Sequence, residues 1–223
     1  MSRPGPITGR PHSRLPFAPE GWKFILPCLV LVIAAALPGW WIAASVLVLL
    51  LLFRLNFFRD PERQTPAGEV FVAPADGRVV RAEAGKKGLR VDIFMNVFDV
   101  HVNRAPMSGR ITHMHYSPGS FVNASFDNAS EVNERNRFEM ETDSGEHIAF
   151  TQIAGLVARR IVSYVAVGDH VGAGQRIGMI RFGSRVDCEI PASYTLQVNV
   201  GDRTVAGKTI LARKSGESGD DES

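Results

Sequence analysis

An uncharged apolar segment from Phe24 to Phe53 limits what this chain can fold into more than any other feature. The segment is thirty residues long and includes two dense runs of valine, leucine and isoleucine. A soluble domain of this size would not expose such a surface. A straight helix of this length would measure about 45 Å, whereas the hydrocarbon core of a bilayer is about 30 Å thick. The segment is therefore expected to enter a membrane and to tilt, bend or turn back there.

The middle of the segment carries a helix-breaking sequence, Pro38-Gly39-Trp40-Trp41. Two arrangements follow: one tilted spanning helix, or two half-length helices in a re-entrant hairpin. Lys23 and Arg54 flank the two ends, which favours the hairpin with both ends in the cytoplasm. A secretory signal is disfavoured because its apolar core is shorter and leads to a small-residue cleavage site. We expect a protein attached to the cytoplasmic face of the cell membrane.

The composition changes on both sides of the apolar segment. Residues 1–23 carry five prolines and four basic residues without apolar periodicity, which predicts a flexible basic arm. Residues 54–213 contain short apolar runs separated by Gly, Pro, Asp and Asn, which is typical of a β-rich domain. Residues 214–223 consist of one lysine followed by Gly, Ser and acidic residues, which predicts a disordered acidic tail.

The expected fold is mainly β, a compact barrel or sandwich behind an N-terminal membrane helix or helical hairpin. The expected strands are Val70 to Val72, Arg78 to Ala82, Arg90 to Phe94, Asp99 to Asn103, Gly109 to Tyr116, Arg137 to Thr142, His147 to Ile153, Arg160 to Tyr164, Arg176 to Phe182, Val186 to Glu189, Thr195 to Val198 and Thr209 to Arg213. The glycine pattern from Val165 to Ile180 resembles the turns of lipoyl-like and biotinyl-like hybrid barrels. Those carriers modify a lysine at a hairpin tip, and no such lysine occurs here. A membrane-tethered adaptor or carrier domain without catalysis is the second hypothesis for this chain.

Charge and cysteine content argue against several classes of protein. The chain has 25 Lys and Arg against 23 Asp and Glu, so no strong basic field indicates nucleic-acid binding. Cys28 and Cys188 lie far apart, and this argues against a disulfide framework or a cysteine zinc site and favours a reducing compartment. His113 and His115 have metal-ligand spacing, but no carboxylate or cysteine in the same local motif completes a set. No metal is expected.

Three polar residues say little when taken one at a time. Asp76 and Ser184 each look like turn residues, and His101 looks like a structural or solvated residue on the polar face of a strand. Their flanking residues make them informative. Four motifs occur in order after the apolar segment: Phe57-Phe58-Arg59-Asp60-Pro61, Pro74-Ala75-Asp76-Gly77, Val100-His101-Val102-Asn103-Arg104-Ala105-Pro106 and Phe182-Gly183-Ser184-Arg185.

This ordered set closely resembles the phosphatidylserine decarboxylase proenzymes of the short subfamily, over roughly residues 54–213. The resemblance implies autocatalytic cleavage between Gly183 and Ser184, with Ser184 converted to a pyruvoyl group that forms a Schiff base with the substrate. It also implies a heterodimer of the two resulting chains, a possible higher oligomer, and conversion of phosphatidylserine in the membrane to phosphatidylethanolamine and CO2. Two departures stand out. Longer members have Leu-Gly-Ser-Thr where this chain has Phe-Gly-Ser-Arg, and they carry a second histidine where this chain has Arg104.

The implied chemistry assigns a role to each motif. Decarboxylation of an α-amino acid needs an electron sink, and no lysine here lies in a recognisable pyridoxal-phosphate context. The Ser184 hydroxyl needs a base, which His101 oriented by Asp76 would supply as an Asp-His-Ser triad. Arg104 and Arg185, with Arg59 and Arg181 as further candidates, are expected to contact lipid phosphate or carboxylate. A third hypothesis keeps this chemistry but assigns a soluble amino acid as the substrate.

Overall fold

The computed structural model describes residues 7–8, 16–85, 88–119, 133–155, 160–181 and 184–216. Most of the predicted basic arm and acidic tail lies outside these ranges. The chain divides into two compact units. One is Pro11–Glu62, and the other combines Arg63–Ser223 with the first ten residues.

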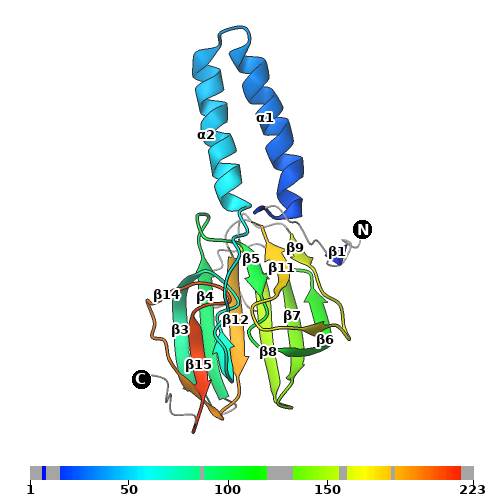
Figure 1. Cartoon of the computed structure of the whole chain (residues 1–223), viewed down its shortest axis with the longest axis vertical. Coiled ribbons are helices and arrows are strands. Elements are labelled where there is room, and N and C mark those ends of the chain that lie inside the picture. The colour runs from blue at the N-terminus through cyan, green and yellow to red at the C-terminus, as the bar shows by residue number, and fades with distance from the viewer. Residues whose placement is uncertain are drawn as a thin grey trace. The chain divides into compact units, whose positions relative to one another are not determined.

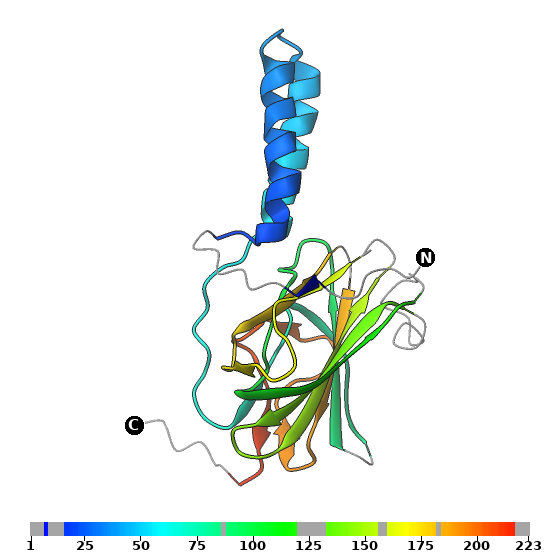
Figure 2. The same cartoon turned by 90° about the vertical axis from the view of Figure 1, so that its right-hand side faces the viewer.

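The first unit is a pair of helices. A short 3-10 helix, η1 (Pro19–Gly21), leads into α1 (Trp22–Ala36), and a turn connects α1 to α2 (Trp41–Phe57). The two helices lie side by side as a hairpin (Figures 1 and 2). The turn falls at the predicted Pro38-Gly39 break, where Gly39 adopts a φ of 81° that favours glycine.

The basic flanks meet at one end of the helix pair. Arg54 Nη1 donates a hydrogen bond to the carbonyl oxygen of Phe24 at 2.6 Å, beside Lys23. The rings of Phe24 and Phe58 stack there with centroids 5.5 Å apart. By length and composition alone, Pro19–Ala36 is long and apolar enough to cross a membrane, while α2 is shorter. The positions of Lys23 and Arg54 agree with the hairpin arrangement, because both charges can then stay on one side of a bilayer.

The second unit is built on a large, mostly antiparallel sheet. In the described part of the chain its strand order is β10, β6, β7, β8, β12, β4, β3, β14. The bounds are β3 Gly77–Gly85, β4 Gly88–Met95, β6 Gly109–Ser117, β7 Arg135–Thr142, β8 His147–Ala154, β10 His170–Val171, β12 Ser184–Ile190 and β14 Arg203–Thr204. The sheet curls into a half barrel (Figure 2).

Among the residues that the structure describes, two smaller sheets accompany the large one. The first has the order β1, β9, β11, β5, with bounds β1 Ile7–Thr8, β5 Val102–Arg104, β9 Ile161–Ser163 and β11 Arg176–Ile180. The second has the order β13, β15, β2, with bounds β2 Val70–Val72, β13 Tyr194–Leu196 and β15 Ile210–Lys214. The expected mainly β, barrel-like fold is confirmed. The two-residue strands β1, β10 and β14 are not predicted, because two residues carry no periodicity.

Alternation along the strands gives the half barrel an apolar inner face. Phe138 of β7 and Phe150 of β8 stack with ring centroids 4.9 Å apart, and both are fully buried. Val186 and Cys188 continue this surface on β12. Each predicted strand overlaps an observed one, although several ends shift.

The shift in β5 changes the surroundings of His101. The prediction placed His101 inside a strand that begins at Asp99, on a polar face, but β5 begins at Val102. The preceding residues form a turn instead: Asn96 N–H donates to the Asp99 carboxylate at 2.8 Å, and Asp99 N–H donates to the Asn96 carbonyl at 3.1 Å. His101 follows this turn and is fully buried rather than solvated.

Candidate active site

Ser184 is the first residue of β12, in the interior of the large sheet. It lies opposite Met95 of β4 on one side and Ala154 of β8 on the other. The alternation that buries Val186 and Cys188 also points Ser184 toward the core, and its side chain is fully buried. Phe182 and Gly183, the other half of the predicted cleavage motif, lie outside the described residues.

A cluster of buried polar side chains surrounds this serine. Ser184 Oγ lies 3.8 Å from the Met95 sulfur, and Asn103 Nδ2 lies 3.7 Å from the same sulfur. Gln152 Nε2 donates a hydrogen bond to Asn103 Oδ1 at 2.8 Å. Asn103 and Gln152 are fully buried. The core of the half barrel is therefore apolar around Phe138 and polar around Ser184.

Sequence reasoning missed Met95 and Gln152. Gln152 carried a usable signal, because it occupies an inward-facing position in β8, whose other inward residues include Ile148 and Phe150. A polar residue at such a position is expected to have a partner or a function. Met95 carried no comparable signal, because a methionine at the end of a buried strand is an ordinary core residue.

His101 is held in one tautomer by the turn before it. Its Nδ1 lies 2.9 Å from the carbonyl oxygen of Asp99, which can only accept a hydrogen bond. Nδ1 therefore carries the hydrogen, and in the neutral ring Nε2 is the basic nitrogen. The carbonyl of His101 accepts a hydrogen bond from Ile180 N–H at 3.3 Å, which places His101 beside the strand that leads toward Ser184.

Asp76, the third predicted member of the triad, is bound to an arginine. Arg63 donates to both carboxylate oxygens, at 2.5 and 2.8 Å, and Ala206 N–H donates to one of them at 2.8 Å. Among the described residues, neither Asp76 nor Ser184 forms a hydrogen bond to His101. The triad therefore stays a prediction.

The predicted substrate arginines make contacts within the protein. Arg104 is buried, and its Nη1 donates to the Gly174 carbonyl at 2.9 Å. Arg185 is buried on the opposite face of β12 from Ser184 and donates to both oxygens of Asp187, at 2.7 and 3.1 Å. Their substrate contacts stay predictions.

The two further arginine candidates are placed differently. Arg59 belongs to the helical unit, where it donates to the carbonyl and the side-chain oxygen of Asn56 at 2.6 and 2.8 Å. The backbone N–H of Arg181 donates to the Arg160 carbonyl at 3.3 Å.

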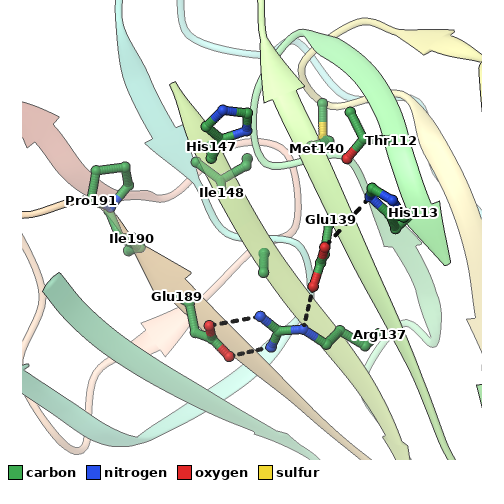
Figure 3. A pocket seen from close by; sticks show the side chains of 11 residues that line it. Thr112, His113, Arg137, Glu139, Met140, His147, Ile148, Glu189, Ile190 and Pro191 are labelled. Carbon is green, nitrogen blue, oxygen red and sulfur yellow. Dashed lines mark hydrogen bonds and ion pairs between the residues drawn. The ribbon is translucent and has the colours of Figure 1, made fainter. Parts of the chain in front are cut away.

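A groove of about 390 Å³ lies toward the far end of β12, five residues beyond Ser184 (Figure 3). Its charged residues pair with one another: Arg137 with Glu189, and Glu139 with both Arg137 and His113. The hydrogen bonds that Arg137 donates to the Glu189 carboxylate raise the pKa of Arg137, which keeps the guanidinium charged. The described residues contain no group of three His, Cys, Asp or Glu side chains that could hold a metal ion. The buried cluster at Ser184 is the better candidate for catalysis, because it places a hydroxyl, a potential nucleophile, among buried amide side chains.

Comparison with known proteins identifies the same family that the sequence motifs around this cluster resemble. The model of a protein family described as "Phosphatidylserine decarboxylase" matches residues 50–212 of this chain. A protein of Nitratidesulfovibrio vulgaris named phosphatidylserine decarboxylase proenzyme is 48% identical over 213 residues, which cover 92% of this chain and 98% of the relative. A protein of the same name from Burkholderia ambifaria is 43% identical over 219 residues, which cover 95% of this chain and 98% of the relative. The match spans Asp76, His101 and Ser184, and the chain belongs to the phosphatidylserine decarboxylase family.

Proposed function

We propose that this chain cleaves itself before Ser184 and then decarboxylates phosphatidylserine to phosphatidylethanolamine at a membrane. The observation that carries the proposal is a fully buried serine at the start of an interior strand, within a polar cluster. The name that the relatives share supplies the substrate and the term proenzyme.

Cleavage begins at the Ser184 hydroxyl. Its oxygen attacks the carbonyl carbon of residue 183, so an ester bond forms, the amide bond breaks, and the proton passes through a base to the amide nitrogen. Loss of the Ser184 α-proton then expels the N-terminal chain, and hydrolysis leaves a pyruvoyl group and ammonia. His101 is the proposed base, because its hydrogen bond to the Asp99 carbonyl leaves Nε2 able to take a proton.

The surroundings of Ser184 suit the product of this reaction. Met95 and Ala154 offer apolar contact on either side of position 184, and Asn103 offers an amide N–H. A pyruvoyl group there would supply the electron sink that decarboxylation requires. His101 is also proposed to return a proton to the substrate carbon after CO2 leaves, so one imidazole would serve both steps. We also propose that Asp76 orients His101. The substrate is proposed to contact Arg104 and Arg185.

The two chains are proposed to stay together as a heterodimer. β12 begins at the cleavage point and pairs along its length with β4 and β8, which both belong to the N-terminal chain. The C-terminal chain also supplies β14 and β15, which pair with β3 and β2. Breaking one peptide bond removes none of these ladders, so the fragments should separate only under denaturing conditions.

The helix pair is proposed to attach the protein to the cytoplasmic face of the cell membrane. Large apolar side chains are exposed over both helices, including Val30, Ile42 and Leu49. A bilayer would cover this surface, and attachment there would bring the protein to its lipid substrate without extraction of the lipid.

The test is intact-mass analysis of the purified protein combined with a lipid assay. The expected result is a C-terminal fragment that starts with a pyruvoyl group at position 184 and release of CO2 from phosphatidylserine but not from free serine. Ser184→Ala should abolish both cleavage and activity. Ser163→Ala is the matched control, because Ser163 is also fully buried but donates to the Val165 carbonyl. An uncleaved, unmodified Ser184 in active enzyme would refute the proposal.

A further inference from the structure

The polar cluster beside Ser184 contains a hydrogen-bond donor with a poor acceptor. Asn103 Nδ2 points to the Met95 sulfur at 3.7 Å, and thioether sulfur is a weak acceptor. Ser184 Oγ points to the same sulfur at 3.8 Å. Two groups that could bond strongly to each other thus converge on one weak partner.

The orientation of Asn103 is fixed from the other side. Its Oδ1 accepts a hydrogen bond of 2.8 Å from Gln152 Nε2, so its Nδ2 must point away from Gln152. Gln152 lies against Gly178, where an added Cβ would come within 3.1 Å of Gln152 Nε2. All of these residues are buried, where a hydrogen bond is stronger than in water.

We propose that Asn103 is a catalytic residue for self-cleavage and that Gln152 is its positioning residue. This inference rests on the proposed function. As the proton leaves Ser184, negative charge develops on Oγ, and the Asn103 amide moves its hydrogen bond from the Met95 sulfur to that oxygen. Donors that await developing charge in a buried site need little reorganisation at the moment of reaction.

The main test compares two single variants with their combination in the full-length protein. Asn103→Leu removes the donor and leaves Gln152 Nε2 without its acceptor. Gln152→Met removes the positioning bond. The double variant removes both ends, so it leaves no orphaned amide from this pair and should regain much of the stability that Asn103→Leu loses. Each variant is followed by thermal unfolding and by the rate at which the two fragments appear on a denaturing gel.

The two roles predict opposite results for the double variant. If Asn103 acts on the reacting oxygen, cleavage slows about 10²- to 10³-fold in Asn103→Leu and stays equally slow in the double variant, although stability recovers. If the pair is only structural, cleavage recovers together with stability, and the inference is overturned. Gln152→Met alone should slow cleavage less than Asn103→Leu. Gln197→Leu is the control, because Gln197 is an exposed carboxamide outside the cluster.

A second substitution covers the case in which Asn103→Leu fails to fold. Asn103→Asp keeps the size and the acceptor for Gln152 Nε2 but removes the amide donor, so the protein should fold while cleavage slows as expected for Asn103→Leu. Cleavage at nearly the wild-type rate in a folded Asn103→Asp protein would overturn the inference. The KM of any cleaved fraction for phosphatidylserine should stay near the wild-type value, whereas general loosening of the site would raise it. A wild-type chain that is never cleaved would refute the proposed function itself rather than this assignment alone.

Discussion

At the scale of single residues, the contacts of Asp76 define a test of the predicted triad. Asp76 is paired with Arg63, whose side chain is nearly buried, so replacing either residue disturbs the same ion pair. If Asp76 acts by orienting His101, Asp76→Asn should slow cleavage at least 10-fold while Arg63→Gln leaves it nearly unchanged. Equal slowing in both variants, followed on a denaturing gel, would show that the ion pair rather than the triad matters.

The buried carboxylate of Asp92, in β4 of the large sheet, should make the stability of the protein depend on pH. Burial raises the pKa of Asp92, and the nearby Asp187 carboxylate adds to this effect, while Arg90 opposes it. The folded state therefore holds this proton more tightly than the unfolded state does. Its contribution to stability is complete below the unfolded pKa, about 3.9, and is lost as the pH rises through the folded pKa.

Asp92→Asn removes this contribution. The unfolding temperature of the variant minus that of the wild type should therefore increase as the pH rises above about 4. Thermal unfolding of both proteins between pH 4 and 7 measures the difference. Glu83→Gln, an exposed substitution on the neighbouring strand, serves as the control. A difference for Asp92→Asn that stays flat or falls with pH would contradict the assigned direction.

At the scale of elements, β11 approaches its neighbours closely because residue 178 is a glycine. A Cβ there would lie 2.4 Å from the Val162 carbonyl oxygen of β9. Gly178→Ala should lower the free energy of unfolding by about 1–3 kcal/mol, the usual cost of overpacking, and should also slow cleavage by displacing Gln152. Gly172→Ala is the matched control, because nothing lies within 4 Å of a Cβ at that position. Equal stability of the two variants in denaturant titrations would show that this close approach is unimportant.

At the scale of the whole molecule, the helix pair is predicted to determine where the protein resides. Val30 and Leu49 are 63% and 67% exposed on the two helices. An arginine near the centre of a membrane helix costs about 2.5–3.5 kcal/mol, so the double variant Val30→Arg, Leu49→Arg should lose most of its carbonate-resistant membrane binding. Val200→Arg is the control, because Val200 is equally exposed, at 63%, in the β-rich unit. Retention of the double variant in the membrane fraction would contradict membrane insertion of the helix pair.

The sequence by itself determined the features that depend on neighbours along the chain. The length and uniformity of the apolar segment, the break at Pro38 and Gly39, and the strand periodicity are local properties, and each has its counterpart in the structure. The ordered motifs around Asp76, His101 and Ser184 also identified the family. Arg185 and Asp187 lie two residues apart and therefore share one face of a strand, so the sequence alone could have predicted their pairing.

Only the tertiary structure decided which distant side chains meet. β12 lies between β4 and β8, and this order brings Met95 and Ala154 to Ser184, while β5 of a separate sheet adds Asn103. The same packing pairs Asp76 with Arg63 and brings Gln152 of β8 to Asn103. Strand order and sheet stacking are set by burial of the whole apolar surface, which alternation within a single strand does not encode.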